Sequence, residues 1–191
     1  MQSPFLQGFY PALIGLSLLT FAGAIGYYLY HQFKVASISD PKQKYDFIIT
    51  TEIRNYKIVW ILISVAAGLL VNLYGRNEAG LSSVGVWFFV RVFFGIAAGT
   101  TIGYISTLLV QFYYPTIMNR KLNRWRYEPR INPSNGRKMK LLSEDQEDVH
   151  LDAGMQEEEK VFSVDYDVWV DETTREVRID KYPGNLTALK L

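Results

Sequence analysis

The most constraining feature of this chain is a long apolar stretch. Between Ala79 and Asn119 the only charged residue is Arg91. Since about 20 apolar residues already cross the hydrocarbon core of a bilayer, the stretch predicts a transmembrane helix. Two further apolar segments precede it. We therefore expect a mainly α-helical membrane protein with three transmembrane helices, at about residues 9–33, 58–74 and 84–114, followed by a polar tail over 116–191.

The third span is longer than a bilayer requires. A helix over residues 84–114 would measure about 46 Å, against about 30 Å of hydrocarbon. We expect it to tilt, or to project from the membrane at one end, and to stop at Pro115 because proline cannot donate the next backbone hydrogen bond.

Lysine and arginine are distributed unevenly around the spans. Thirteen of them lie in the inner loop 34–57 or early in the tail, whereas the loop between the second and third spans carries only Arg76. Cytoplasmic segments carry such an excess, and three spans place the inner loop and the tail on one side. We expect the N-terminus outside and the C-terminus inside. A bacterial inner membrane is favoured, with the mitochondrial inner membrane as the alternative.

Small residues recur at four-residue spacing in the spans, which is typical of closely packed transmembrane helices. The third span has the longest such row, resembling a glycine zipper, and the second has a shorter row. These residues are the candidates for helix packing, either within this chain or against a partner subunit: Gly95, Gly99, Gly103 and Thr107 in the third span, and Ser64, Gly68 and Asn72 in the second.

Arg91 is the intramembrane charge. It lies near the outer end of the third span, so its side chain can snorkel to the headgroups. Alternatively it binds a carboxylate of another subunit, a lipid phosphate or a cofactor propionate. No Asp or Glu lies in the three spans, so an acidic partner would come from outside this chain. The same absence argues against a self-contained proton pathway.

The inner loop contains a signal for the start of a helix. In Ser39-Asp40-Pro41 a capping residue precedes a proline at the first helical position. The apolar residues that follow are interleaved with charges. This pattern predicts a short interfacial helix leading into the second span, with a plain connector as the alternative.

The tail divides into three blocks. Residues 120–140 are basic and predict contact with anionic lipid or a partner, through Arg120, Lys121, Arg124 and Arg126. Residues 141–159 are acidic, with a capping-box pattern at Ser143 and Gln146 and a helix end at Gly154. Residues 162–182 predict a β-hairpin. Its alternating apolar face has too little cover in the chain and is expected to meet a partner: Val164, Tyr166, Val168 and Val170.

The chain has no cysteine and only two histidines, His31 and His150. Thiolate metal sites, disulfides and iron–sulfur ligation are therefore excluded, and we expect no cofactor, no metal site and no enzymatic activity. Basic residues beside a spanning helix indicate lipid rather than nucleic acid. The leading hypothesis is a non-catalytic membrane subunit of a larger complex of respiratory, transport or secretion type. It would contact other integral subunits with its helices and a soluble or peripheral partner with its tail.

The second hypothesis is an ion-conducting or stator-type subunit of an energy-coupled channel. Hydroxyl side chains of the third span supply candidate pore-lining groups: Thr100, Thr101, Ser106 and Thr107. In topology alone the arrangement is similar to that of ExbB-type proton-channel subunits. The short first inner loop departs from that family, so the resemblance assigns no residues here.

Overall fold

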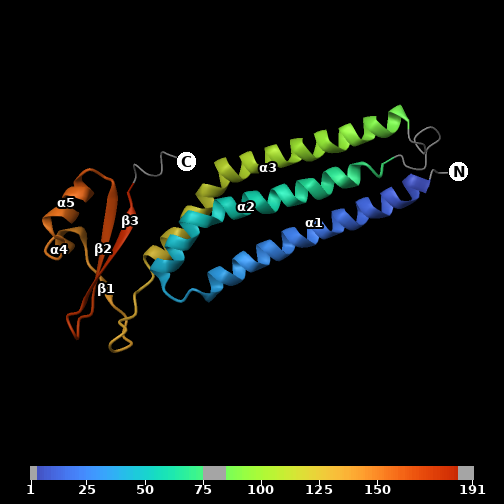
Figure 1. The fold of residues 1–191 in the computed structure, drawn as a ribbon. Helices are drawn as coiled ribbons and strands as arrows, with labels where there is room; N and C mark the ends of the chain where they lie inside the picture. The colour runs from blue at the N-terminus through green and yellow to red at the C-terminus, as the bar shows by residue number, and fades with distance from the viewer. Residues whose placement is uncertain (1–3, 75–84, 185–191) are drawn as a thin grey trace. The chain divides into compact units, whose positions relative to one another are not determined.

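Three long apolar helices dominate the computed structural model, which describes residues 4–74 and 85–184. They are α1 (Pro4–Ser37), α2 (Pro41–Val71) and α3 (Val86–Arg126), and each is long and apolar enough to cross a membrane. Figure 1 shows them side by side, with successive helices running in opposite directions. The expectation of three membrane-spanning helices is confirmed at this level. The connection that carries Arg76 lies outside the described residues.

The chain divides into two compact units. The three-helix unit comprises Met1–Ser37 and Phe47–Asn119, and the tail unit comprises Ile38–Asp46 and Arg120–Leu191. The tail unit therefore includes the connection between α1 and α2. An ion pair between Arg178 Nη1 and Asp40 Oδ2 (2.7 Å) joins two segments of the tail unit that are 138 residues apart.

The start of α2 follows from its capping residues. The Asp40 carboxylate accepts a hydrogen bond from the Gln43 backbone N–H (3.0 Å), and the Asp40 carbonyl accepts one from that of Lys44 (3.0 Å). Pro41 occupies the first helical position, where its missing N–H costs nothing. No glycine or proline follows until Gly68, so the helix runs without a break through the predicted inner loop. The alternative of a plain connector is therefore wrong.

The expectation that α3 stops at Pro115 is also wrong. The helix continues through Pro115 to Arg126 over 41 residues, a length of about 61 Å. Proline removes one backbone donor, but the neighbouring turns stay helical when the surrounding residues hold the helix in place. In the turns after Pro115, Met118 and Leu122 are buried, and this packing is not apparent from the local sequence.

Helix α1 packs through one face only. Its buried residues recur at spacings of four and seven: Leu6, Tyr10, Ser17, Ala24 and His31. On this face the Ser17 hydroxyl donates to the Ala66 carbonyl of α2 (3.1 Å), a bond of the kind that holds helices together in lipid. Helix α1 therefore has a second, opposite face free for other contacts.

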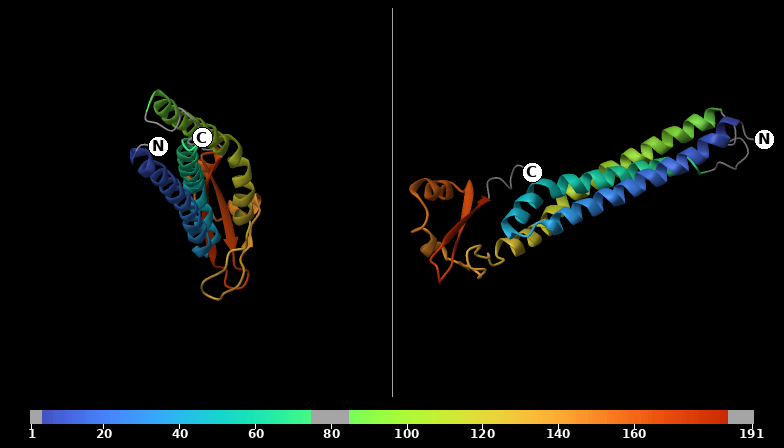
Figure 2. Two further views of the ribbon diagram at one scale, coloured as in Figure 1. Left: turned by 90° about the vertical axis from the view of Figure 1, so that its right-hand side faces the viewer. Right: turned by 60° about the horizontal axis from the view of Figure 1, so that its bottom comes forward.

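The tail unit is built on a small antiparallel sheet. Its strands are β1 (Lys140–Leu141), β2 (Val164–Val170) and β3 (Val177–Pro183), in the order β1-β2-β3. Val168 pairs with Ile179 and Val170 with Val177, so β2 and β3 form the predicted hairpin and β1 adds a third strand. Figure 2 shows β2 and β3 as a twisted pair.

Two short helices, α4 (Glu144–Glu147) and α5 (Ala153–Lys160), complete the tail unit. Two details of the predicted helix ends are wrong. Ser143 precedes α4, but its side chain makes no capping bond. Gly154 lies inside α5 rather than ending it, and α5 is capped by Asp152, whose carboxylate accepts from the Met155 N–H (2.8 Å).

Candidate functional site

The small-residue rows of α2 and α3 face each other inside the three-helix unit. A Cβ atom added to Gly68 would lie 2.8 Å from the Gly95 carbonyl oxygen and 3.1 Å from Gly99 Cα. One added to Gly103 would lie 2.7 Å from Ser64 Oγ. We call this contact the glycine seam, and it comprises Ser64 and Gly68 of α2, Asn72 directly after α2, and Gly95, Gly99 and Gly103 of α3. These rows are therefore occupied within the chain. Thr107, the last residue of the predicted row, donates to its own helix at the Tyr104 carbonyl (2.9 Å).

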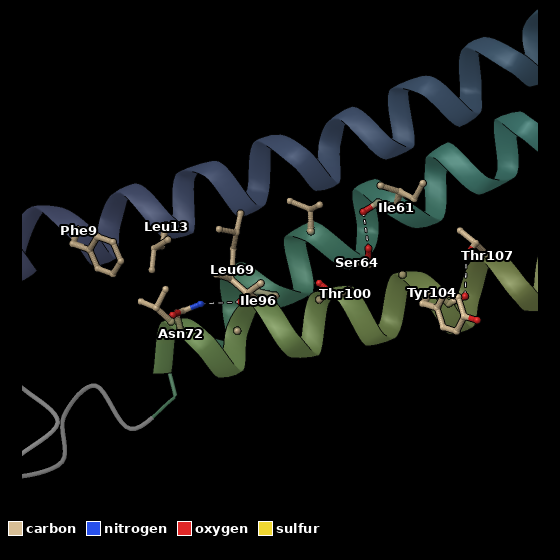
Figure 3. Close-up of a pocket in the computed structure, with 16 residues that line it drawn as sticks. Phe9, Leu13, Ile61, Ser64, Leu69, Asn72, Ile96, Thr100, Tyr104 and Thr107 are labelled. Atoms are coloured by element: carbon tan, nitrogen blue, oxygen red, sulfur yellow. Dashed lines mark hydrogen bonds between the residues drawn. The ribbon is translucent and has the colours of Figure 1, made fainter. Parts of the chain in front are cut away.

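A groove runs beside the glycine seam. It encloses about 720 Å³ and is bounded by α1, α2 and α3 (Figure 3). Phe9 and Leu13 of α1 form one wall, and Ile96 and Tyr104 of α3 contribute to the other. We call this space the seam groove. A mostly apolar groove with a few polar groups is typical of small-molecule sites.

Asn72 is the polar residue at one end of the seam groove. Its side chain is 8% exposed, and its amide nitrogen donates to the Gly68 carbonyl (3.0 Å). That bond fixes the orientation of the amide. The amide oxygen is buried and has no hydrogen-bond partner among residues 4–74 and 85–184. A buried acceptor left without a donor costs about 1–3 kcal/mol, so this atom is a candidate contact for a ligand.

Arg91 is turned toward α1. Its Nη2 donates to the Tyr10 hydroxyl (2.7 Å), and the guanidinium carbon lies 5.7 Å from the centre of the Tyr10 ring. Tyr10 itself is 4% exposed and packs with Phe88 and Leu6. The other two guanidinium nitrogens, Nε and Nη1, are buried without a hydrogen-bond partner in the described part of the chain. This position fits the hypothesis of a charge held inside the protein better than that of a side chain extended into the headgroups.

A polar layer crosses the opposite end of the three-helix unit, and the sequence reasoning missed it. Side-chain hydrogen bonds join neighbouring helices there: Tyr27 to Asn55 (2.8 Å), Gln32 to Tyr56 (3.4 Å), Lys57 to Gln111 (3.0 Å) and Tyr114 to Glu52. Glu52 is only 1% exposed. The signal was available, because Glu52, Asn55 and Tyr56 share one face of a helix that nothing interrupts after Pro41.

The glycines of α1 have a different environment from those of the glycine seam. Among the described residues, nothing lies within 4 Å of a Cβ atom added to Gly8, Gly15, Gly23 or Gly26. Several of them share one exposed face with two alanines, at spacings of three, four and seven residues: Gly8, Ala12, Gly15, Ala22 and Gly26. We call this the small face of α1. It lies opposite the face that contacts α2 and α3.

The basic residues of the tail have different roles. Arg120 and Arg124 are exposed and Lys121 is half-buried. Arg126 instead forms ion pairs with Asp165 and with Asp167 (2.6 Å to the latter). Arg126 therefore serves the fold of the tail unit and is not a free lipid contact.

Arg130 is the central buried cation of the tail unit and was not singled out from the sequence. It is 0% exposed, pairs with Asp180 (2.6 Å) and lies over the Trp169 ring. It also donates to the carbonyl of Trp125, in the last turn of α3, and to that of Glu128, just beyond the helix. Arg130 thus stabilises the end of α3 and the polar side of the sheet together.

The apolar side of the hairpin is covered by the chain itself. Tyr166 and Val168 are buried with Leu151, and the residues that complete this cluster are Leu142, Met155, Val164, Val170 and Ile179. The expectation that this face has too little cover is wrong, because the segments carrying α4 and α5 fold back onto it. The face of Val164, Tyr166, Val168 and Val170 therefore gives no reason to expect a partner.

Acidic side chains line a hollow of about 530 Å³ in the tail unit, and Glu147 is the buried member. Burial, together with the nearby carboxylate of Glu159, raises the pKa of Glu147 to about 7. Within the described residues no group of three or more His, Asp or Glu side chains has the arrangement of a metal site. We therefore expect the stability of the tail unit to depend on pH through Glu147.

Comparisons with known proteins give no assignment: no family model, no curated protein and no solved structure matches this chain.

Proposed function

We propose that this chain is a non-catalytic integral membrane subunit that assembles with other membrane proteins through α1. The supporting observation is the small face of α1. In lipid there is no hydrophobic drive between helices, so small residues collect where backbones approach closely. The small-residue rows of α2 and α3 already pack against each other, whereas Gly8, Gly15 and Gly26 have open space beside them. A helix of a partner subunit is the occupant that fits this face.

Gly15→Leu tests this proposal. Nothing in the described chain lies within 4 Å of a Cβ atom at this exposed position, so the three-helix unit should fold as before. A leucine at the centre of a close helix contact should separate the two proteins through overpacking. We expect the variant to lose the stoichiometric partners that copurify with the wild-type chain in mild detergent. Thr101→Leu is the control, since it places the same leucine side chain at an exposed position of α3. Retention of all partners by Gly15→Leu would contradict the proposal.

The proposed orientation places the N-terminus outside and the tail inside a bacterial inner membrane, next to the anionic leaflet. It rests on the thirteen Lys and Arg of the inner loop and early tail. Further support comes from the ion pair between Asp40 and Arg178, which puts the α1–α2 connection and the tail in one unit. Cysteines introduced at Ser39 and Ser134 should be protected from an impermeant reagent in intact cells, and cysteines at Ser3 and Ser83 should react. The reverse pattern would refute the orientation.

The second candidate function is an ion-conducting subunit, and it is favoured by the buried position of Glu52. The sequence argument against a proton pathway was that no carboxyl group lies in the spans. Glu52 is buried within α2 and accepts a hydrogen bond from Tyr114 of α3. Buried ionisable groups between membrane helices often mark ion pathways. Proton flux into vesicles containing the purified chain, abolished by Glu52→Gln, would establish this function. A ring made of this chain alone would also favour it over the first proposal.

A further inference from the structure

Arg91 forms part of the lining of a hollow that is separate from the seam groove. This hollow encloses about 710 Å³ between α2 and α3, and we call it the Arg91 hollow. Apart from Arg91, its lining is apolar or aromatic and includes Ala67, Leu70 and Val71 of α2, Tyr74 just after α2, and Trp87 and Phe94 of α3. The enclosed volume is within the usual range for small-molecule sites.

The charge of Arg91 has no counterpart among the described residues of the three-helix unit. Two of its guanidinium nitrogens, Nε and Nη1, are buried there without an acceptor, and the third donates to the neutral hydroxyl of Tyr10. The only carboxyl group in that part of the unit is Glu52. Glu52 accepts from Tyr114, which is about 35 Å from Arg91 along α3. Because a buried guanidinium without an anion is unfavourable, an oxyanion from elsewhere is the group that fits.

The lining of the Arg91 hollow changes along the helices. Helices α2 and α3 run in opposite directions (Figure 1), and Gly68 packs against Gly95. Leu70 and Phe94 therefore lie farther from the start of α3 than Arg91 does, whereas Trp87 lies about 6 Å nearer to it. An exposed tryptophan at the end of a spanning helix is typical of the headgroup level. The hollow thus has an aromatic outer end, then the cation, then an apolar inner part.

We propose that the Arg91 hollow binds a phospholipid, with its phosphate on Arg91 and one acyl chain along the apolar inner part. The order of polarity in the hollow matches that of a lipid in the leaflet at the end where α3 begins. Phosphate oxygens accept strong hydrogen bonds from a guanidinium. The Arg91 side chain turns into the hollow to meet them, and the enclosed space leaves room for that rotation. Free phosphate carries the same oxyanion but would leave the apolar part unused.

Two lipids with the same acyl chains test the role of the phosphate. Phosphatidylglycerol or diacylglycerol is added to the full chain in a mild detergent, and bound lipid is counted by native mass spectrometry. We expect one phosphatidylglycerol on the wild-type chain and binding of diacylglycerol that is at least about tenfold weaker. Arg91→Gln should weaken phosphatidylglycerol binding about tenfold and leave diacylglycerol binding unchanged. Equal binding of the two lipids to the wild-type chain, or no retained lipid, would overturn the proposal.

Val71→Trp and Val86→Trp form a matched pair for the apolar part. Both valines are exposed, one as the last residue of α2 and the other as the first of α3, but only Val71 lines the Arg91 hollow. An indole at position 71 occupies the space proposed for the acyl chain, so phosphatidylglycerol binding should weaken at least about tenfold. Val86→Trp should bind as the wild-type chain does. The same affinity for both variants would contradict the site, as would stabilisation of the wild-type chain by inorganic phosphate alone.

Glu78→Gln distinguishes a lipid phosphate from a carboxylate of this chain. Glu78 is the carboxyl group of the connection between α2 and α3, and it lies outside the described residues. We expect Glu78→Gln to bind phosphatidylglycerol with wild-type affinity and, without added lipid, to keep the wild-type melting temperature. If Glu78→Gln and Arg91→Gln lower the melting temperature equally and the double variant lowers it no further, Glu78 is the counterion and the proposal is wrong.

A measurement on the wild-type chain guards against misfolding of the variants. Phosphatidylglycerol with a photoactivatable group in one acyl chain should crosslink to the inner part of the Arg91 hollow, at Leu70 and Phe94. Crosslinks spread evenly over exposed apolar positions of α1, such as Leu18, would refute a defined site.

Discussion

Replacing Gly95 by alanine is the sharpest test of the glycine seam. The added Cβ would lie 2.0 Å from the Asn72 amide nitrogen and 2.8 Å from the Gly68 carbonyl oxygen. Asn72 can move aside only by losing its bond to Gly68, and the backbone oxygen can move only if α2 and α3 separate. Overpacking of this kind costs about 1–3 kcal/mol. Alanine is also a better helix former than glycine by up to about 1 kcal/mol. We expect a net loss of about 1–2 kcal/mol.

Gly15→Ala is the matched control, because open space surrounds Gly15. It should leave the stability unchanged or raise it by up to about 1 kcal/mol through helix propensity alone. The natural chain has no cysteine, so labels on Leu70→Cys and Phe89→Cys can report the separation of α2 and α3. The free energy of unfolding is then measured by titration with sodium dodecyl sulfate. If the two alanine variants agree within about 0.5 kcal/mol, the close approach of α2 and α3 is refuted.

A double-mutant cycle assigns the loss to its cause. In an Asn72→Ala background the nearest obstacle to the new methyl group is gone, while the Gly68 carbonyl oxygen at 2.8 Å remains. The cost of Gly95→Ala should fall by about 1 kcal/mol but should not vanish. Strict additivity of the two substitutions would show that Asn72 does not occupy the position described.

The tail unit supports three further predictions. Arg130→Met should destabilise it by about 3 kcal/mol, because the buried Asp180 carboxylate loses one of its two arginine partners and keeps only Arg178. Methionine at the exposed Arg124 should change little, and hydrogen exchange of the sheet measures both variants. The raised pKa of Glu147 means that the folded tail unit binds this proton more tightly than the unfolded chain does. The stability that Glu147 contributes is therefore fully present below the unfolded pKa of 4.5 and falls as pH rises toward 7. Glu147→Gln should therefore stabilise the tail unit by about 1–2 kcal/mol at pH 8 and have no such effect at pH 4; a gain independent of pH would contradict this. Phe162 has φ of 54° at the end of α5, so Phe162→Gly should stabilise by about 1 kcal/mol while Phe162→Ala, which keeps a Cβ, should not.

The three long apolar helices could be predicted from the sequence because they depend on quantities that are read along the chain. The length of each apolar run determines whether a helix can cross the bilayer, and Ala79 to Asn119 is far longer than required. Alternation with a period of two determines a strand, and β2 begins within two residues of the predicted start at 162. The capping signal at Asp40 located the first residue of α2 for the same reason, since caps act through bonds to the next few residues.

Which faces meet was decided only by the tertiary structure. Four-residue spacing shows that Gly95, Gly99 and Gly103 share a face, but not that α2 of the same chain covers it while the small face of α1 stays open. The sequence placed Glu52 in a polar loop, and only the tertiary structure shows it buried and bonded to Tyr114 of α3. In the sequence Arg130 is one member of a basic block, and only the folded sheet places Asp180, 50 residues later, against it. Spacing along a helix or strand shows which residues share a face. Which segment covers that face depends on the packing energies of segments that are distant in the sequence.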